Sequence, residues 1–178
     1  MMRALETPRL RLEPQTAAHA QAMFAVLSDP EIYRFENAPP TSAAALHERY
    51  AKLETRRSGD GREEWLNWVL RLRSGDPIGY VQATVQADGQ AFVAYVLGSA
   101  HWGQGLASEA SAAMIGELVA RHGVHTLWAV FKRANARSRR LLERLGFGAA
   151  DRAQAERMAI DADEDLMQRR VAATVPAR

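Results

Sequence analysis

The sequence contains no cysteine among its 178 residues. This absence excludes disulfides, thiolate metal sites and cysteine nucleophiles together. No uncharged apolar run approaches the roughly 18 residues that a membrane-spanning helix requires. Residues 1–13 alternate charged residues with leucine instead of forming the apolar stretch of a signal peptide. We therefore expect a cytoplasmic protein that does not contact the membrane.

Charge of one sign is also scarce, because 23 basic residues offset 21 acidic residues and leave a net charge of +2. Both signs are mixed along the chain, so we expect no nucleic-acid partner. The hydrophobic share of 47% and the charged share of 25% are ordinary for a globular protein. Since a domain typically has about 150 residues, we expect a single domain over residues 1–171 and a loose C-terminal tail over residues 172–178.

Hydrophobic periodicity predicts how strands and helices follow one another. The chain opens with a strand and two helices, and continues with a meander of three antiparallel strands in which Asp88-Gly89 is the hairpin signal. A strand, a glycine loop and a helix follow in that order, which predicts a mixed α/β fold. The predicted elements are a strand at 9–13, helices at 16–27 and 40–57, strands at 65–72, 78–85 and 91–97, a helix at 107–123, a strand at 127–131, a helix at 135–145, and a last hairpin of 158–160 with 166–171.

The glycine loop, residues 102–108, has the sequence Trp102-Gly103-Gln104-Gly105-Leu106-Ala107-Ser108. Its two glycines permit a tight turn and a close approach of a ligand to the main chain. The helix that follows offers unpaired N–H groups and the positive end of its dipole, which together favour an anion such as a pyrophosphate. The loop lacks the Walker lysine and the third glycine of the dinucleotide motif. A glycine turn that merely begins a helix is therefore the alternative interpretation.

A second segment strengthens the functional interpretation. Asn135-Ala136-Arg137-Ser138 is followed by Leu141, Leu142 and Leu145-Gly146-Phe147. Together with the glycine loop, this segment resembles the GNAT superfamily of acetyl-CoA-dependent N-acetyltransferases, in particular the branch around the ribosomal-protein N-terminal acetyltransferases. Members of that branch show a WGxGxAxEA segment and an NxxSxxLLxxLGF segment. The similarity extends from residues 7–12 through Ile78-Gly79-Tyr80 to residues 164–167, and so covers nearly the whole chain.

The resemblance implies a single-domain GNAT-like α/β (α+β) fold, with a central mixed, mostly antiparallel sheet, flanking helices and a bulged strand that splays from its neighbour. It implies acetyl-CoA as the cosubstrate, with the pyrophosphate on the loop amides and the pantetheine arm beside the end of the splayed strand. For Asn135 and Ser138, capping of a helix is an alternative to ligand contact. The implied cofactor-binding residues are Tyr95, Val96, Leu97, Trp102, Gly103, Gln104, Gly105, Leu106, Ala107, Ser108, Asn135 and Ser138.

The implied chemistry is direct attack of an amine on the acetyl carbonyl, with the Leu97 N–H stabilising the oxyanion. Many family members carry a tyrosine general acid where this chain has Leu142, so Ser138 is the remaining candidate acid. The sequence does not single out a general base. Glu36, Glu109 and His101 are the candidates within reach, each with a structural role as the alternative.

Several points stay open at this stage. The acceptor is a primary amine, either a small molecule or a protein N-terminus, and a homodimer is one possibility. Because the tyrosine is missing, a catalytically impaired acyl-CoA-binding sensor or interaction module is the alternative function, and a binder of another nucleotide phosphate is a weaker one. We expect no metal, because cysteine is absent and His122 and His125 flank Gly123 as surface or capping residues. One residue of the basic run could bind the 3′-phosphate of coenzyme A, and that run comprises Lys132, Arg133, Arg137, Arg139, Arg140 and Arg144.

Overall fold

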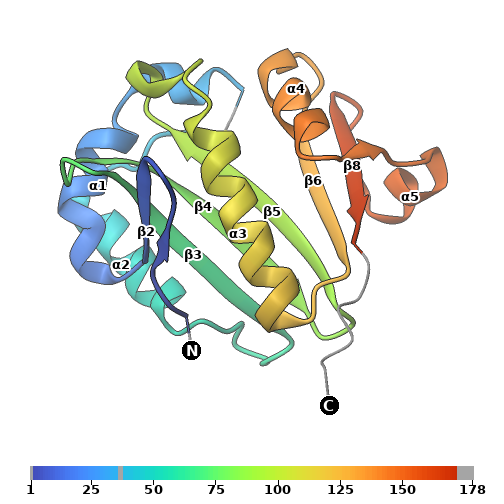
Figure 1. The fold of residues 1–178 in the computed structure, drawn as a ribbon, viewed down its shortest axis with the longest axis horizontal. Coiled ribbons are helices and arrows are strands. Elements are labelled where there is room, and N and C mark those ends of the chain that lie inside the picture. The colour runs from blue at the N-terminus through green and yellow to red at the C-terminus, as the bar shows by residue number, and fades with distance from the viewer. Residues whose placement is uncertain (1, 36–37, 172–178) are drawn as a thin grey trace.

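The computed structural model describes residues 2–35 and 38–171, so the predicted tail at 172–178 lies outside the described residues. Its centre is an eight-stranded sheet with the order β1-β2-β3-β4-β5-β6-β8-β7 (Figure 1). All neighbours are antiparallel except β5 and β6, which run parallel. This is the mixed, mostly antiparallel sheet that the sequence predicts.

The elements follow the predicted order closely. The strands are β1 (Leu5–Glu6), β2 (Leu10–Pro14), β3 (Glu63–Leu72), β4 (Pro77–Gln86), β5 (Gln90–Leu97), β6 (Thr126–Lys132), β7 (Gly148–Ala149) and β8 (Glu164–Arg170). The helices are α1 (Ala20–Leu27), α2 (Ala43–Glu54), α3 (Leu106–His122), α4 (Ala136–Arg144) and α5 (Arg152–Arg157), with short 3-10 turns at Ala17–His19, Pro30–Arg34 and Ser99–His101. Over residues 2–35 and 38–171, none of these helices combines the length and the apolar character needed to cross a bilayer.

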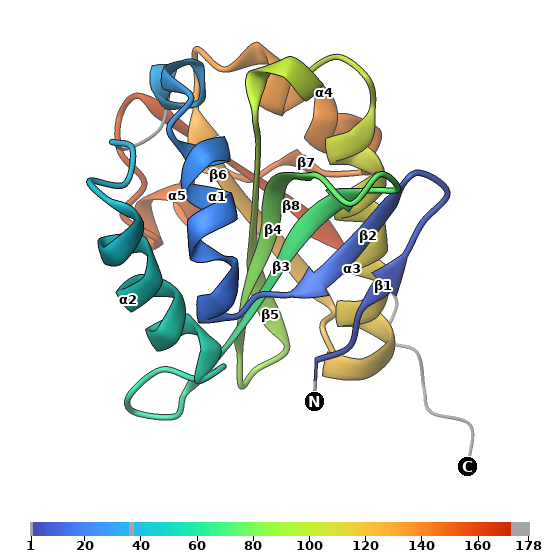
Figure 2. The same cartoon turned by 90° about the vertical axis from the view of Figure 1, so that its left-hand side faces the viewer.

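Helices cover both faces of the sheet. Figure 2 shows α1 and α2 on one side of the central strands and α3 on the other. The alternation in β3 predicts one buried face, but residues Leu66 to Leu70 are all buried. Trp68 packs in the core beneath α3, whereas Val69 packs in a second core with α1 and α2. The prediction of a half-exposed strand was wrong because two helical layers enclose β3.

Helix termini follow local capping chemistry. The side chain of Ser42 accepts a hydrogen bond from the Ala45 N–H at 3.0 Å and caps the start of α2, within the range 40–57 predicted for this helix. The helix ends at Glu54, before the predicted end of that range. α3 ends at Gly123, which adopts a left-handed conformation (φ 64°) and donates its N–H to the Leu118 carbonyl. The predicted stop of this helix is confirmed.

The splayed strand pair is present. β5 pairs with β6 only from Gln90 to Phe92, and beyond this point the two strands diverge (Figure 1). The bulge expected in β5 is not found among the described residues. β4 pairs with β5 in an unbroken register that runs from the pair Gly79–Leu97 to the pair Val85–Ala91 beside the hairpin. A Cβ on Gly79 would lie 2.0 Å from the Val96 carbonyl oxygen, so glycine allows this close pairing. The register shift lies instead between β3 and β4, after Leu70.

The last predicted hairpin is half wrong. Residues 166–171 do belong to a strand, β8, but residues 158–160 do not form its partner. Asp151 and Gln154 form a reciprocal capping box that starts α5 in this region, and Ala159 has a positive φ of 52° that is incompatible with a strand. β8 pairs with β6 on one side and with the two residues of β7 on the other.

Candidate active site

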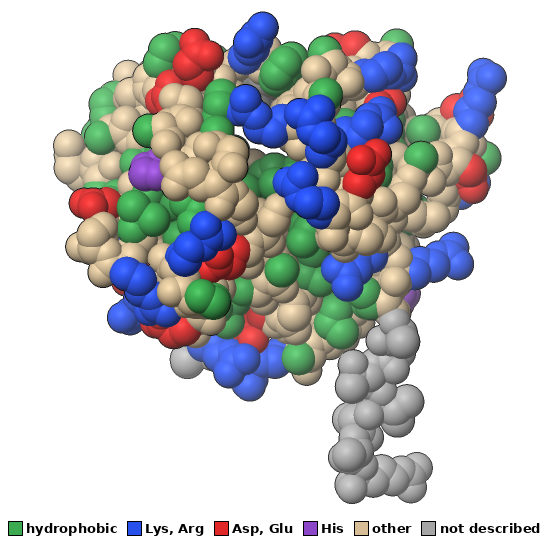
Figure 3. Space-filling view, turned by 45° about the horizontal axis from the view of Figure 1, so that its top comes forward, with side chains coloured by type: hydrophobic (Ala, Val, Ile, Leu, Met, Phe, Trp, Pro, Cys, Tyr) green, Lys and Arg blue, Asp and Glu red, His purple; other side chains and the backbone are tan. Residues whose placement is uncertain are grey.

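A cleft of about 560 Å³ opens where β5 leaves β6. Its walls are the end of β5, the glycine loop, the start of α3, the start of α4 and the segment at residues 31–35, and we call it the β5–α4 cleft. Figure 3 looks onto this hollow and shows Lys and Arg side chains (blue) along its rim. Eleven of the twelve predicted cofactor-binding residues line the cleft, and Gln104 is the exception. The Gln104 amide instead donates to the Ala100 carbonyl at 3.1 Å, which turns this side chain back onto the preceding turn.

The glycine loop has the conformation that an anion cradle requires. Gly103 and Gly105 both have positive φ, 75° and 78°, and a Cβ on Gly103 would meet no atom within 4 Å. Gly105 is the N-cap of the 17-residue helix α3, and no side chain caps that end within the described chain. Ser108 lies one turn in, lines the cleft and carries a buried hydroxyl without a hydrogen-bond partner in the described structure. The loop therefore presents main-chain N–H groups to the cleft, and the Ser108 hydroxyl is buried at its lining.

Trp102 connects three parts of the site. Its indole N–H donates to the Leu97 carbonyl at 2.9 Å, which ties the glycine loop to the end of β5. The guanidinium of Arg137, in the first turn of α4, lies 4.2 Å from the centre of the Trp102 ring. Cation–π contact of this kind fixes α4 against the loop. Trp102 is thus a packed aromatic residue as well as part of the cleft wall, and no pattern in the sequence indicates its pairing with Arg137.

The backbone at the end of β5 faces the cleft. Gly98 donates its N–H to the Ile78 carbonyl on β4 at 2.9 Å. Because successive residues of a strand point their N–H groups to opposite sides, the Leu97 N–H points away from β4, toward the space that β6 has vacated. The Tyr95 backbone shares this direction. An extended ligand can therefore hydrogen-bond to β5 in the position of an added strand.

Asn135 and Ser138 both line the cleft, and Asn135 also caps α4. The Asn135 side chain accepts a hydrogen bond from the Ser138 N–H at 3.1 Å, so it is the N-cap of α4. The Tyr95 hydroxyl donates to the Ser138 carbonyl at 3.3 Å, and Tyr95 lines the cleft. The family resemblance implies cofactor binding by Tyr95 but assigns no role to its phenol. Leu142 has 1% of its surface exposed and belongs to the core.

The basic run divides into two groups. Arg133 and Arg139 both pair with Asp165, and Lys132 lies 3.0 Å from Asp163 and 3.1 Å from Glu164. The other three residues, Arg137, Arg140 and Arg144, line the β5–α4 cleft. One group of basic residues thus pairs with the acidic residues at the start of β8, and the other group faces the cleft.

The candidate bases have different surroundings. Glu109 accepts hydrogen bonds from the Thr7 hydroxyl at 2.6 Å and from Arg9, and it does not line the cleft. Burial alone would raise the pKa of Glu109, but these donors outweigh burial and lower it. His101 lines the cleft. Glu36 lies outside the described residues.

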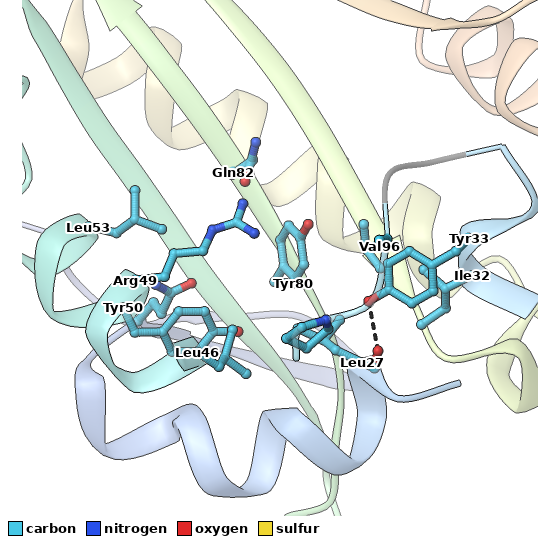
Figure 4. Close-up of a pocket in the computed structure, with 13 residues that line it drawn as sticks. Leu27, Ile32, Tyr33, Leu46, Arg49, Tyr50, Leu53, Tyr80, Gln82 and Val96 are labelled. Carbon is cyan, nitrogen blue, oxygen red and sulfur yellow. Dashed lines mark hydrogen bonds between the residues drawn. The ribbon is translucent and has the colours of Figure 1, made fainter. Parts of the chain in front are cut away.

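A smaller pocket of about 80 Å³ lies on the opposite face of the sheet, between α2 and β4 (Figure 4). We call it the α2 pocket. Three tyrosines contribute to its lining, Tyr33, Tyr50 and Tyr80, and the Tyr33 hydroxyl donates to the Leu27 carbonyl at 2.7 Å. Ile32 and Val96 line both the α2 pocket and the β5–α4 cleft, so the two hollows adjoin at the end of β5.

A cleft at a splayed strand pair, with the N-terminus of a helix in its wall, is the arrangement that the resemblance to acetyl-CoA-dependent transferases implies. The sequence model of the acetyltransferase (GNAT) domain matches residues 9–148. The chain therefore belongs to the GNAT family, and the protein is an acetyltransferase.

Known relatives agree with this assignment. An uncharacterized N-acetyltransferase of Bacillus subtilis, YoaA, is 29% identical over 154 residues, which are 83% of this chain and 84% of that protein. Among solved structures, RimL, a ribosomal L7/L12 alpha-N-protein acetyltransferase in complex with coenzyme A, superposes with a TM-score of 0.81 at 15% identity, over 96% of this chain and 99% of that chain. A ribosomal-protein-S5-alanine acetyltransferase from Vibrio fischeri gives a TM-score of 0.78 at 14% identity, over 99% and 100% of the two chains. At these identities the two structures show the fold.

Proposed function

We propose that this protein is an acetyl-CoA-dependent N-acetyltransferase, a single domain over residues 1–171, that moves an acetyl group to a primary amine by direct attack within a ternary complex. The observation that carries the proposal is the β5–α4 cleft. It brings the end of β5, the glycine loop and the start of α4 to one hollow, and it includes eleven of the twelve residues expected to bind the cofactor. RimL, which shares this fold, was solved with coenzyme A.

The residues present fit a coenzyme A ester. The loop amides and the buried Ser108 hydroxyl suit the pyrophosphate, because they are hydrogen-bond donors at the positive end of a helix. The backbone of Tyr95 and Leu97 suits the pantetheine arm. Arg137, Arg140 and Arg144 suit the remaining phosphate charge, since guanidinium groups bind phosphate oxygens strongly.

Acetyl-CoA supplies an activated thioester when bound. The Leu97 N–H points into the cleft and would stabilise negative charge that develops on the carbonyl oxygen during attack. A departing thiol with a pKa of about 8.5 needs only modest proton donation, and the Ser138 and Tyr95 hydroxyls are the two donors beside the expected thioester. The amine would arrive from the α2 pocket, which adjoins the cleft at Val96.

Thermal unfolding with acetyl-CoA, coenzyme A and ATP in parallel tests the cofactor. A ligand present at about 100 times its dissociation constant adds about 2.7 kcal/mol of stability, which corresponds to a Tm increase of about 5–10 °C for a chain of this size. We expect this increase with both coenzyme A compounds and none with ATP. Absence of a shift with acetyl-CoA and coenzyme A would refute the proposal.

A second candidate, a binding module that has lost turnover, is favoured by the burial of Leu142 where relatives carry a tyrosine acid. Release of free thiol from acetyl-CoA in the presence of a panel of primary amines separates the two functions. A binding module would show the Tm increase without amine-dependent thiol release.

A further inference from the structure

The α2 pocket contains two buried polar groups whose hydrogen bonding is not satisfied by the described chain. Gln15 and Tyr50 are 2% and 3% exposed, and both line the pocket. The Gln15 amide nitrogen and the Tyr50 hydroxyl have no hydrogen-bond partner among the described residues. Buried polar groups in folded proteins are almost always paired. Two such groups at one hollow therefore indicate a polar ligand group there.

The charge of the pocket indicates the sign of that group. Figure 4 shows the Arg49 guanidinium extending from α2 toward Gln82 and Tyr80. Arg49 is the single charged side chain in the described lining, and no ion pair or hydrogen bond engages it within the described structure. Its cationic field disfavours a second ammonium group, as in a polyamine, and favours an anion.

The three groups are all donors. A guanidinium cannot accept a hydrogen bond, the unpaired atom of Gln15 is an amide NH₂, and burial raises the pKa of Tyr50 so that its hydroxyl stays protonated. A carboxylate is the complementary group, because it only accepts. The apolar part of the lining, which includes Leu27, suits a short carbon chain.

We propose that the acceptor is a primary amine that also carries a carboxylate, and that Arg49, Gln15 and Tyr50 bind this carboxylate in the α2 pocket. The inference rests on the proposed function, because it places the amine at the junction with the β5–α4 cleft. Two sources share this chemistry: a free amino carboxylate, and an acidic side chain close to a peptide N-terminus.

Matched acceptor pairs test the proposal. β-Alanine against β-alaninamide and γ-aminobutyrate against its amide represent the free compounds. The C-terminally amidated peptides Ala-Glu-Ala-NH₂ and Ala-Gln-Ala-NH₂ represent the second source, because the glutamate side chain is then the single carboxylate in the pair. Thiol release is a clean readout, because the enzyme has no cysteine of its own. In at least one arm we expect kcat/KM to be about tenfold higher for the carboxylate, which is about 1.4 kcal/mol. The arm that shows this preference identifies the source.

Substitutions show whether the pocket is responsible. Arg49→Gln should remove most of the preference by lowering kcat/KM for the carboxylate and not for the amide, while the affinity for coenzyme A stays the same. Tyr50→Phe should weaken the preference in the same direction. Arg62→Gln is the matched control, because this side chain is 85% exposed in a loop and does not line the α2 pocket.

Failure of this inference and failure of the proposed function give different results. Equal kcat/KM values for both members of every pair, or an equal loss for both in Arg49→Gln, would overturn the carboxylate proposal and leave acetyl transfer standing. If no amine in the panel is turned over, calorimetry with the coenzyme A complex decides, and equal or absent binding of acid and amide overturns the proposal. Absence of coenzyme A binding would overturn the proposed function itself.

Discussion

The substitution Gly105→Asp tests directly whether the glycine loop binds the pyrophosphate. Gly105 is the N-cap of α3 with φ 78°, and a Cβ there would meet only the Arg9 guanidinium, at 3.5 Å. Aspartate is a favoured N-cap residue and, after glycine and asparagine, tolerates the left-handed region. The substitution should therefore leave the protein folded, while it places a carboxylate where the pyrophosphate is expected.

The size of the effect follows from electrostatics. Two unit charges about 5 Å apart repel by about 3 kcal/mol at an effective dielectric constant of about 20. Arg9 partly neutralises the introduced carboxylate and so lowers this repulsion. The carboxylate also offsets the attraction between the N-terminus of α3 and the pyrophosphate, about 0.3–1 kcal/mol, and this adds to the loss of binding free energy. A net loss of about 2–4 kcal/mol weakens coenzyme A binding about 30- to 700-fold.

Calorimetric titration of coenzyme A into the folded variant measures this loss directly. Gly105→Ala carries the same backbone strain without the charge and should lose much less affinity. Gly59→Asp adds the same charge in a loop where a Cβ meets no atom within 4 Å, and it should bind normally. A folded Gly105→Asp protein with unchanged affinity would refute the placement of the pyrophosphate on this loop.

Three further predictions concern catalysis and stability. Ser138→Ala or Tyr95→Phe should lower kcat about 10²-fold without weakening acetyl-CoA binding, whichever hydroxyl is the acid, and normal kcat in both variants would exclude both. Gly79→Ala should destabilise the protein in urea by more than about 4 kcal/mol, because its Cβ would overlap a strand carbonyl at 2.0 Å; a loss below about 1 kcal/mol would contradict this. The pKa of Glu109 lies below its ordinary value of 4.5 in the folded protein. The ionised carboxylate therefore stabilises the fold at pH values above 4.5, and this contribution is lost as the pH falls through the lowered pKa. The Tm difference between wild type and Glu109→Gln should therefore vanish at low pH, and a constant difference would argue against it.

Much of the fold follows from local signals in the sequence. The glycines that end α3 and α4, the Asp88-Gly89 hairpin and the cap at Asn135 each depend on a few neighbouring residues, and all appear where expected. The positions of the glycine loop and of Asn135 follow for the same reason, since both lie at the start of a helix. The splayed strand and the cofactor residues came from resemblance to a family, because no single residue encodes the separation of β5 from β6.

The sequence failed where tertiary contacts decide the outcome. The alternation in β3 places the polar Asn67 on the face opposite Trp68, where water contact is the expectation, but Asn67 is 3% exposed because α1 and α2 cover that face. Residues 158–160 have apolar members, but the capping box at Asp151 commits the preceding segment to a helix. Arg49 could not be singled out, because its role depends on which side of α2 faces the gap above β4.

The basic run of α4 divides according to the phase of the helix. Arg137, Arg140 and Arg144 are separated by three and four residues, the spacing of one helical face, whereas Arg139 falls on another face and reaches Asp165. Leu141 and Leu142 fix which side of α4 is buried. Once residues 136–144 are taken as a helix, its phase alone predicts three arginines along the cleft rather than an undivided basic patch. This arrangement argues that the charge of α4 serves anionic ligands in the β5–α4 cleft and the packing of α4 onto β8 at the same time.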